Sequence, residues 1–348
     1  MTDLGELALA LVNVPSVSRQ EQAITDWIAG FVEREVAHFP VHHRQADAIV
    51  FGPPGTPDVI FAGHSDTVPE QGNLPGRVEG GWVHGLGASD MKGSLAVMLA
   101  LAAEVRRPAV SPWFVIFGRE ELPLAESLMQ GLFDTCPAMR QAQLALVMEP
   151  TANRLQAGCL GNIKAELVFE GVAAHSARPW LGVNAIHESV RGLSGLAGAE
   201  PHDVVLDGLT FREVLSVTEI HGGIANNVVP DRVVCGLNFR YAGDRTPDEA
   251  EARLRHLIGP VGRLHVVSNS PGAPVSLGNP LVGRLRGEAG LPVEPKQAWT
   301  PVAEFAMRGV DAVNLGSGDP ELAHRRDERV SVAAMETTRS MLRDFLTH

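Results

Sequence analysis

The sequence has few of the features that mark membrane proteins, disulfide-rich secreted proteins or nucleic-acid-binding proteins. It contains no run of about 18 consecutive apolar residues, so we expect no segment to span a bilayer. Its three cysteines, Cys136, Cys159 and Cys235, are far apart and never form a Cys-x-x-Cys pair. This spacing argues against a disulfide framework and a thiolate metal site, and it is typical of buried thiols in a reducing cytosol.

Basic residues are also scarce, with 29 lysines and arginines against 41 aspartates and glutamates. The resulting formal net charge of −12 argues against nucleic acid or an anionic membrane surface as a partner. The opening residues, MTDLGELALALV, are acidic and lack the basic start and small-residue cleavage site of a signal peptide. We therefore expect a cytoplasmic protein.

The rest of the composition is that of an ordinary globular protein, with 45% apolar and 20% charged residues. A chain of 348 residues exceeds what one hydrophobic core usually serves, so two domains are expected. Apolar runs at 59–63, 113–118 and 144–148 alternate with helical patterns, one of which follows a capping-box pair, Ser18 and Glu21. Such runs predict an α/β domain whose mixed, mostly parallel sheet is covered by helices.

The pattern changes from about residue 163 onward. Strand-like segments (163–170, 214–220, 232–241, 264–267) and helical segments (184–196, 246–258) follow in the order β-α-β-β-α-β. This order is ferredoxin-like. The segment 268–280, rich in Pro, Gly and Ser, is interpreted as a returning linker. We therefore predict a main domain from residues 1–162 and 273–348, with an inserted α+β domain of residues 163–272.

One apparently buried strand ends in a pair of polar residues. The apolar run Val59–Gly63 is followed by His64, and Asp66 lies two positions later. Because side chains alternate along a strand, His64 and Asp66 would face the same way. The pair fits a satisfied core histidine, a general base with its orienting carboxylate, or a metal ligand with the group that orients it.

The other predicted strands end in acidic residues. Glu120 and Glu121 follow the strand 113–118, Glu149 follows the strand 144–148, and Asp90 shortly precedes a helix over 95–105. Each alone also fits an exposed acid or, for Asp90, a helix cap. If the strands are neighbours, these carboxylates and His64 converge at the carboxyl edge of the sheet, where ligands bind. Without cations, carboxylates crowded in this way would repel one another and would largely be protonated. A divalent metal ion would remove this repulsion, and it binds such N and O ligands.

Glu120 and Glu121 also make chemical sense as a pair. One can bind metal while its neighbour, left free of metal, accepts a proton from water. A site with two co-catalytic metals needs this division, because a carboxylate that binds metal is unavailable as a base.

Five segments, GHSDTV, GLGASDMKG, REEL, MEP and GSGDPELAH, occur in this order along the chain. The set resembles the co-catalytic di-zinc deacylase and exopeptidase family, which includes succinyl-diaminopimelate desuccinylase, acetylornithine deacetylase, aminoacylase and glutamate carboxypeptidase. The resemblance covers essentially the whole chain and implies that the inserted domain is a lid and dimerisation domain. NLPGRVEGGWVHGLGASDMKG, AGCLGNIKAELVFEGVAAHSARPWLGVNAIH and GGIANNVVPDRVVCGLNFRY are most similar to the actinobacterial-type desuccinylases.

The resemblance implies two Zn²⁺ ions per subunit, for which Co²⁺ or Mn²⁺ can substitute. His64 and Glu149 would hold one zinc, Glu121 and His324 the other, and Asp90 would bridge them. Asp66 would accept the other N–H of His64, and Glu120 would be the general base and acid.

The resemblance also implies that the lid contributes to the site and that the protein is a homodimer. His175 would enter from the partner subunit's lid and polarise the scissile carbonyl. Arg178, Asn227 and Arg240 would bind substrate carboxylates, and Gly318 would line the pocket.

The implied reaction is hydrolysis of a linear amide, in particular of N-succinyl-LL-2,6-diaminopimelate, a step of lysine and diaminopimelate biosynthesis. Two zinc ions with three ligand carboxylates leave a net positive centre, which favours a small anionic N-acyl amino acid. An acetylornithine or acetyl-citrulline deacetylase, an aminoacylase or a dipeptidase remains open, because pocket shape decides among them. A catalytically dead binding homologue is disfavoured because every candidate ligand and Glu120 are retained.

Overall fold

The computed structural model describes residues 3–45 and 47–348, and the chain divides into two compact units. Unit 1 is formed by Met1–Gly158, Ser276–Glu294 and Thr300–His348. Unit 2 is formed by Cys159–Val275 and Pro295–Trp299. Unit 2 is thus inserted into unit 1, which the chain enters again near residue 276.

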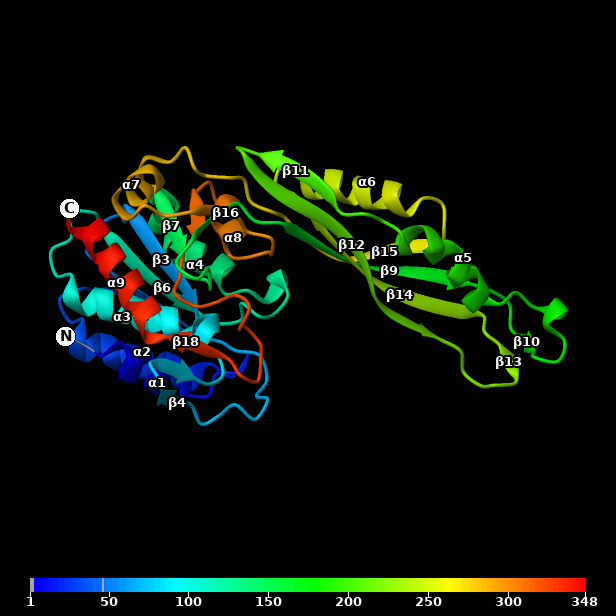
Figure 1. The fold of residues 1–348 in the computed structure, drawn as a ribbon, viewed down its shortest axis with the longest axis horizontal. Coiled ribbons are helices and arrows are strands. Elements are labelled where there is room, and N and C mark those ends of the chain that lie inside the picture. The colour runs from blue at the N-terminus through cyan, green and yellow to red at the C-terminus, as the bar shows by residue number, and fades with distance from the viewer. Residues whose placement is uncertain (1–2, 46) are drawn as a thin grey trace. The chain divides into compact units, whose positions relative to one another are not determined.

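Unit 1 is built on an eight-stranded mixed sheet (Figure 1). The strand order is β1 (Val41–Gln45), β2 (Ala48–Phe51), β6 (Pro112–Phe117), β3 (Val59–His64), β7 (Leu144–Val147), β17 (Ala312–Asn314), β8 (Leu155–Ala157) and β16 (Val293–Pro295). The central strands β6, β3, β7 and β17 are parallel, whereas β1, β2 and β8 pair antiparallel. These central strands are buried throughout, which explains their continuous apolar sequences. The predicted α/β class is confirmed.

Seven α-helices of unit 1 lie within the described residues. They are α1 (Leu4–Val12), α2 (Gln22–Glu35), α3 (Gly93–Glu104), α4 (Met129–Thr135), α7 (Pro280–Ala289), α8 (Val302–Ala306) and α9 (Val332–Thr347). Helix α3 is buried from Gly93 to Ala102 and packs against α1 and α9. An Ala- and Leu-rich helix can be apolar on all sides because it is covered on all sides.

The predicted capping box of Ser18 and Glu21 is wrong. Helix α2 begins at Gln22, and neither side chain caps it. The Ser18 hydroxyl instead donates to the Asp66 carboxylate at 2.7 Å, and the Glu21 carboxylate accepts the backbone N–H of Arg119 at 3.1 Å. Both side chains satisfy groups next to the candidate site, and these long-range contacts replace the local cap.

A small antiparallel sheet joins two distant segments of unit 1. It consists of β4 (Arg77–Glu79), β5 (Trp82–His84) and β18 (Arg329–Ser331), with β5 in the middle. Strand β5 leads into the turn that carries Asp90, and β18 follows the loop that carries His324. The pairing therefore holds these two loops of unit 1 near each other.

Unit 2 contains a five-stranded antiparallel sheet with helices α5 (Ala185–Ala197) and α6 (Pro247–Ile258). The strand order is β11 (His202–Leu206), β12 (Leu209–Gly222), β14 (Arg232–Tyr241), β9 (Gly161–Glu170) and β15 (Arg263–Ser270). In β14, buried and half-buried residues alternate, and the buried side chains form a core with α5 and α6. The sequence Thr246-Pro247-Asp248-Glu249 has the pattern of a capping box, and in the structure Thr246 and Glu249 form this box at the start of α6.

Unit 2 differs from the sequence-based expectation in two places. Strand β11 was not predicted, and it forms a hairpin with an extended β12 that begins at Leu209. Strand β15 continues to Ser270, so the first residues of the predicted linker belong to the sheet. In both cases cross-strand pairing, which a local pattern does not contain, extends the strands.

A short two-stranded ribbon completes unit 2. It pairs β10 (Ala174–His175) with β13 (Val228–Val229). Among the described residues, no helix is both long and apolar enough to cross a membrane. Cys136, Cys159 and Cys235 are buried thiols outside any disulfide, as predicted.

Candidate metal centre

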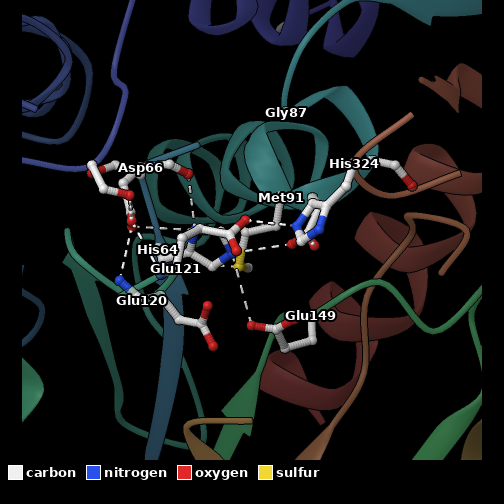
Figure 2. A network of polar contacts seen from close by, with 12 residues as sticks. His64, Asp66, Gly87, Met91, Glu120, Glu121, Glu149 and His324 are labelled. Atoms are coloured by element: carbon white, nitrogen blue, oxygen red, sulfur yellow. Dashed lines mark hydrogen bonds and ion pairs between the residues drawn. The ribbon is translucent and has the colours of Figure 1, made fainter. Parts of the chain in front are cut away.

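Three neighbouring parallel strands present their polar ends at one edge of the unit 1 sheet. Strand β3 ends at His64, Glu120 and Glu121 follow β6, and Glu149 follows β7. Because these strands are parallel and adjacent, their carboxyl ends meet, and Figure 2 shows the side chains gathered there. The predicted convergence of these residues is therefore present in the structure.

Asp90 lies between two imidazoles. Its Oδ1 is 3.1 Å from His64 Nε2, and its Oδ2 is 3.5 Å from His324 Nε2. The turn that presents Asp90 contains Gly87 with φ +74°, where an added Cβ would lie 2.7 Å from Thr67 Cγ2. Glycine therefore supplies both the left-handed conformation and the close approach at this position.

Glu121 and Glu149 flank this centre on its two sides. Glu121 Oε1 lies 2.8 Å from His324 Nε2, and Glu149 Oε1 lies 3.9 Å from His64 Nε2. The loop residue His324 adopts a left-handed backbone with φ +60°, which is uncommon for a non-glycine residue and recurs at functional sites. The five side chains thus form two groups that share Asp90.

This donor set fits divalent metal ions. Ligand atoms of His64, Asp90 and Glu121 all lie within 4.8 Å of one another. Two ligands at about 2.0 Å from a tetrahedral zinc ion are about 3.3 Å apart, so only small movements separate these donors from coordination. Two imidazoles and three carboxylates also match the N/O preference of zinc, cobalt and manganese.

The pKa values of His64 and His324 also indicate that the cluster fits a metal ion. Burial acts to lower the pKa of His64, but hydrogen bonds with Asp66 and Asp90 raise it well above its usual value. Hydrogen bonds with Asp90 and Glu121 raise the pKa of His324 to about 10. The two imidazoles therefore hold protons at the positions where a metal ion would place positive charge, and metal binding would release those protons.

Asp66 makes more contacts than the sequence suggested. His64 Nδ1 lies 3.0 Å from the backbone oxygen of Asp66 and 3.4 Å from its Oδ1. The Asp66 carboxylate also accepts the backbone N–H of Glu120 at 3.0 Å and of Glu121 at 3.2 Å. One fully buried carboxylate therefore orients the histidine and both glutamates.

Glu120 differs from the other carboxylates of the cluster. Figure 2 shows its carboxylate on the same side as that of Glu149 and away from the imidazole of His324. Burial, and then the negative charge of Glu149, raise the pKa of Glu120 well above its usual value. A carboxyl group with a raised pKa is suited to exchange protons near neutral pH.

The predicted residues of unit 2 fall into two separate places. His175, Arg178 and Asn227 are exposed and lie on or beside the β10–β13 ribbon, where Ser176 N donates to Asn227 O at 2.9 Å. His175 Nδ1 accepts the N–H of Ala177 at 3.0 Å, so the neutral ring carries its proton on Nε2. Arg240 lies far along β14, opposite Asn162 of β9.

Arg240 is a half-buried cation without an acidic partner within 4 Å among the described residues. Burial lowers its pKa, and its Nε donates to Asn238 Oδ1 at 3.0 Å. Asn238 in turn donates to Asn162 Oδ1 at 2.9 Å. These bonds orient the guanidinium through Nε, and its two terminal nitrogens are not used in them.

Gly318 packs against the Asp90 turn within unit 1. A Cβ at this position would lie 2.1 Å from the backbone oxygen of Ser89, so only glycine permits this approach. Its predicted role in a substrate pocket stays a prediction.

Sequence reasoning missed the residues that support the cluster. The Ser18 hydroxyl donates to the Asp66 carboxylate, and the Glu328 carboxylate accepts the backbone N–H of Gly87 in the turn that carries Asp90. Lys92 is buried beside the cluster, and its Nζ donates to Val14 O at 2.9 Å. Of these three residues, only Lys92 lies within one of the five segments that carry the family resemblance, GLGASDMKG. The other two lie outside the quoted motifs, and their contacts join positions far apart in the chain.

Comparison with known proteins agrees with this geometry. Residues 60–348 match the model of peptidase family M20/M25/M40. The chain belongs to this family. A Corynebacterium glutamicum protein named succinyl-diaminopimelate desuccinylase is 34% identical over 357 residues, covering 98% of this chain and 95% of its own. A Mycobacterium tuberculosis (strain H37Rv) protein, whose name assigns the same activity provisionally, is 38% identical over 98% of this chain and 97% of its own.

Solved structures share the fold at low sequence identity. Aminopeptidase PepT from Bacillus cereus has a TM-score of 0.78 at 19% identity, over 99% of this chain and 97% of that chain. The YXEP protein of Bacillus subtilis, described as a dinuclear metal-binding peptidase, has a TM-score of 0.70 at 15% identity, over 98% and 96% of the two chains.

Proposed function

We propose that the protein hydrolyses N-succinyl-LL-2,6-diaminopimelate to succinate and LL-2,6-diaminopimelate, as a cytoplasmic enzyme of lysine and diaminopimelate biosynthesis. The observation that carries the hydrolase chemistry is Asp90 between His64 and His324, with Glu121 and Glu149 on either side. The substrate rests on the names of the full-length relatives at 34% and 38% identity.

In this proposal the centre holds two Zn²⁺ ions, for which Co²⁺ or Mn²⁺ can substitute. His64 and Glu149 would bind one ion, Glu121 and His324 the other, and Asp90 both. Bound zinc supplies Lewis acidity that polarises the amide carbonyl and lowers the pKa of water. Asp66 keeps the His64 ring in place through its contacts with Nδ1.

Glu120 is the proposed general base and acid. Its carboxylate accepts a proton from the attacking water and delivers that proton to the nitrogen of the departing diaminopimelate. The raised pKa of Glu120 and its place beside the cluster support this role. His175 is proposed to polarise the scissile carbonyl through a hydrogen bond from its Nε2–H to the carbonyl oxygen, where negative charge develops.

Arg240 is proposed to bind a substrate carboxylate, because its half-buried guanidinium has no acidic partner within 4 Å among the described residues. Asn227 and Arg178 are proposed to bind the other carboxylates, and Gly318 to line the pocket. N-succinyl-LL-2,6-diaminopimelate has carboxylates at both ends that such groups can bind.

The positions of Arg240 and His175 support a homodimer. Strand β14 begins at Arg232, shortly after β13, and Arg240 lies eight residues further along β14. Eight residues of strand span about 26 Å, and the ribbon that carries His175 lies beyond that end of the strand. One small substrate cannot reach both residues of one chain, so we propose that His175 comes from the partner subunit.

Strand β12 offers a surface for such a dimer. Strand β11 pairs only with Leu209–Glu213, so within the described residues Val214–Gly222 has no strand on the side opposite β14. Val217 and Ile220 on this segment are exposed, as are Ile186 and Val190 on α5, which packs against β12. An unpaired strand edge beside exposed apolar residues fits two-fold pairing.

Comparative rates test the proposed substrate. The purified protein would be assayed with N-succinyl-LL-2,6-diaminopimelate, N-acetylornithine, N-acetylcitrulline, an N-acyl monocarboxylic amino acid and a dipeptide at equal metal loading. The proposal requires the largest kcat/KM for the succinyl compound. A larger value for another substrate would assign that activity to the same site, and binding of metal without any hydrolysis would favour a catalytically dead binding homologue.

A further inference from the structure

The turn that carries Asp90 is held by a buried carboxylate from the far end of the chain. Glu328 is 2% exposed and lies just before β18, four residues after His324. Its Oε2 accepts the N–H of Gly87 at 2.9 Å. Its Oε1 accepts the N–H of Ser89 at 2.9 Å and the N–H of Asp90 at 3.0 Å.

Three backbone N–H groups thus converge on a single carboxylate. Gly87, with φ +74° and ψ 5°, reverses the local backbone so that these N–H groups point to the same side. Such a concave arrangement of N–H groups binds anions, and here the anion belongs to the protein itself. A carboxylate that accepts several N–H bonds forms stronger bonds than a neutral group does.

The same residue also joins the Asp90 turn to the His324 loop through the backbone. Gly85 N donates to Glu328 O at 3.0 Å, and β18 then pairs with β5. Ser89 Oγ donates to Asp319 O at 2.8 Å, which adds a second tie between the two segments. The separation of Asp90 from His324 therefore depends on the contacts of Glu328.

We infer that Glu328 is a positioning residue that holds the Asp90 carboxylate between the two histidines and thereby sets metal affinity. This inference rests on the proposed metal centre but not on the proposed substrate. Because the Asp90 N–H is bound by Glu328, the turn directs the Asp90 side chain to the opposite side, toward His64 and His324.

Glu328→Gln is the informative change. The glutamine has nearly the same shape, but only one of its terminal atoms accepts a hydrogen bond. Either its amide NH₂ faces the Gly87 N–H, or it faces the Ser89 and Asp90 N–H groups, and in both cases donor meets donor. Supporting residues of metal ligands change metal affinity about 10- to 100-fold when replaced, and we expect a loss of that size.

The measurement is a titration of the chelator-stripped full-length protein with Zn²⁺ by isothermal titration calorimetry, together with the visible absorption spectrum of the Co²⁺ form. Glu328→Gln should weaken at least one metal equivalent about 10- to 100-fold and alter the Co²⁺ spectrum. Glu328→Asp keeps the charge but is one methylene shorter, so its affinity should lie between those of wild type and Glu328→Gln.

Glu213→Gln is the matched control. Glu213 is a buried carboxylate of unit 2 that accepts the N–H of Ala242 at 3.0 Å and pairs with Arg245, far from the ligands in sequence. Its replacement should lower thermal stability but leave Zn²⁺ affinity unchanged. If Glu328→Gln behaved in the same way, with wild-type affinity and spectrum, Glu328 would serve stability alone and the inference would be overturned.

A double-mutant cycle identifies the group through which Glu328 acts. In an Asp90→Ala background the remaining proposed ligands can still bind metal, and adding Glu328→Gln should cause no further loss of affinity. A further loss equal to that in wild type would show that Glu328 does not act through Asp90. If Glu328→Gln does not fold, Glu328→Asp decides the matter, because wild-type affinity in that variant contradicts the inference.

Failure of this inference is separable from failure of the proposed function. Wild-type protein that binds no Zn²⁺ would contradict the proposed function itself. Wild-type protein that binds two equivalents, with Glu328→Gln unchanged, would contradict only the role of Glu328.

Discussion

The two units of the protein differ in how they present most of their candidate functional residues, although His324 of unit 1 is exposed. In unit 1, His64, Asp66 and Glu149 are at most 6% exposed and lie at the ends of buried strands. In unit 2, His175 and Asn227 are exposed on a two-stranded ribbon. The sheets differ in the same sense, because the central strands of unit 1 are buried throughout, whereas β14 of unit 2 alternates between buried and half-buried positions.

This difference teaches where each group finds its partners. A buried imidazole among carboxylates must be satisfied within its own fold, and the contacts of His64 are indeed complete within unit 1. The exposed His175, and Arg240 with no acidic partner within 4 Å among the described residues, are the groups that we propose contact substrate or another subunit.

Metal removal should have the largest effect. Stripping the protein with a chelator should abolish hydrolysis, and added Zn²⁺ should restore it, because the proposed chemistry depends on metal-activated water. Activity and metal content would be measured on the same samples. Full activity in protein that contains no metal would refute the proposed mechanism.

Substitution of the adjacent glutamates should separate their roles. Glu120→Gln cannot accept a proton, so turnover should fall about 10²- to 10⁴-fold or more while both metal ions remain bound. Glu121→Gln should instead lower the occupancy of one metal site. Kinetics and metal analysis check both, and loss of metal from Glu120→Gln alone would reverse the two assignments.

Subunit mixing should test whether the exposed His175 serves the partner's site. Glu120→Ala and His175→Ala should each be nearly inactive. A mixed dimer would hold one intact site and one site with both defects. Random re-association makes about half of the dimers mixed, so about a quarter of wild-type activity should return.

The control for this experiment is proof of exchange. The two variants would carry different affinity tags, and co-purification would show that mixed dimers had formed. No recovery of activity in such dimers would mean that His175 acts in its own subunit or has a structural role only.

A smaller effect should come from Glu304, a buried carboxyl of unit 1 outside the proposed ligand set. Burial raises its pKa from 4.5 to about 7, although Ser127 partly opposes this. Between these values the folded protein keeps the proton that the unfolded chain releases, so stability falls as pH rises. Glu304→Gln should remove this loss. The decrease in the free energy of unfolding from pH 5 to pH 8 should therefore be about 1–3 kcal/mol smaller in the variant than in wild type.

Denaturant unfolding of metal-stripped protein at the two pH values would measure this change. Metal affinity should be unaffected, because Glu304 interacts with Ser127 and Arg308 rather than with a proposed ligand or the turn that carries Asp90. Equal stability changes at both pH values would show that Glu304 does not hold its proton in the folded state.

Features that depend on a local pattern of residues could be predicted from the amino-acid sequence alone. Continuous apolar runs revealed the buried parallel strands, and the Thr246–Glu249 pair marked the start of α6. Polar residues at the ends of successive strands indicated a shared edge, because parallel neighbours bring their carboxyl ends together. Residue types and spacing were enough for these conclusions.

The distant groups that support the site could be found only from the folded structure. Ser18 and Glu21 have the pattern of a helix cap, yet they bond to Asp66 and Arg119. Glu328 has no local signature, yet it binds the turn at 87–90, more than 230 positions earlier in the chain. Such contacts depend on how elements far apart in sequence pack together, because a buried carboxylate bonds to whichever N–H groups the fold places beside it.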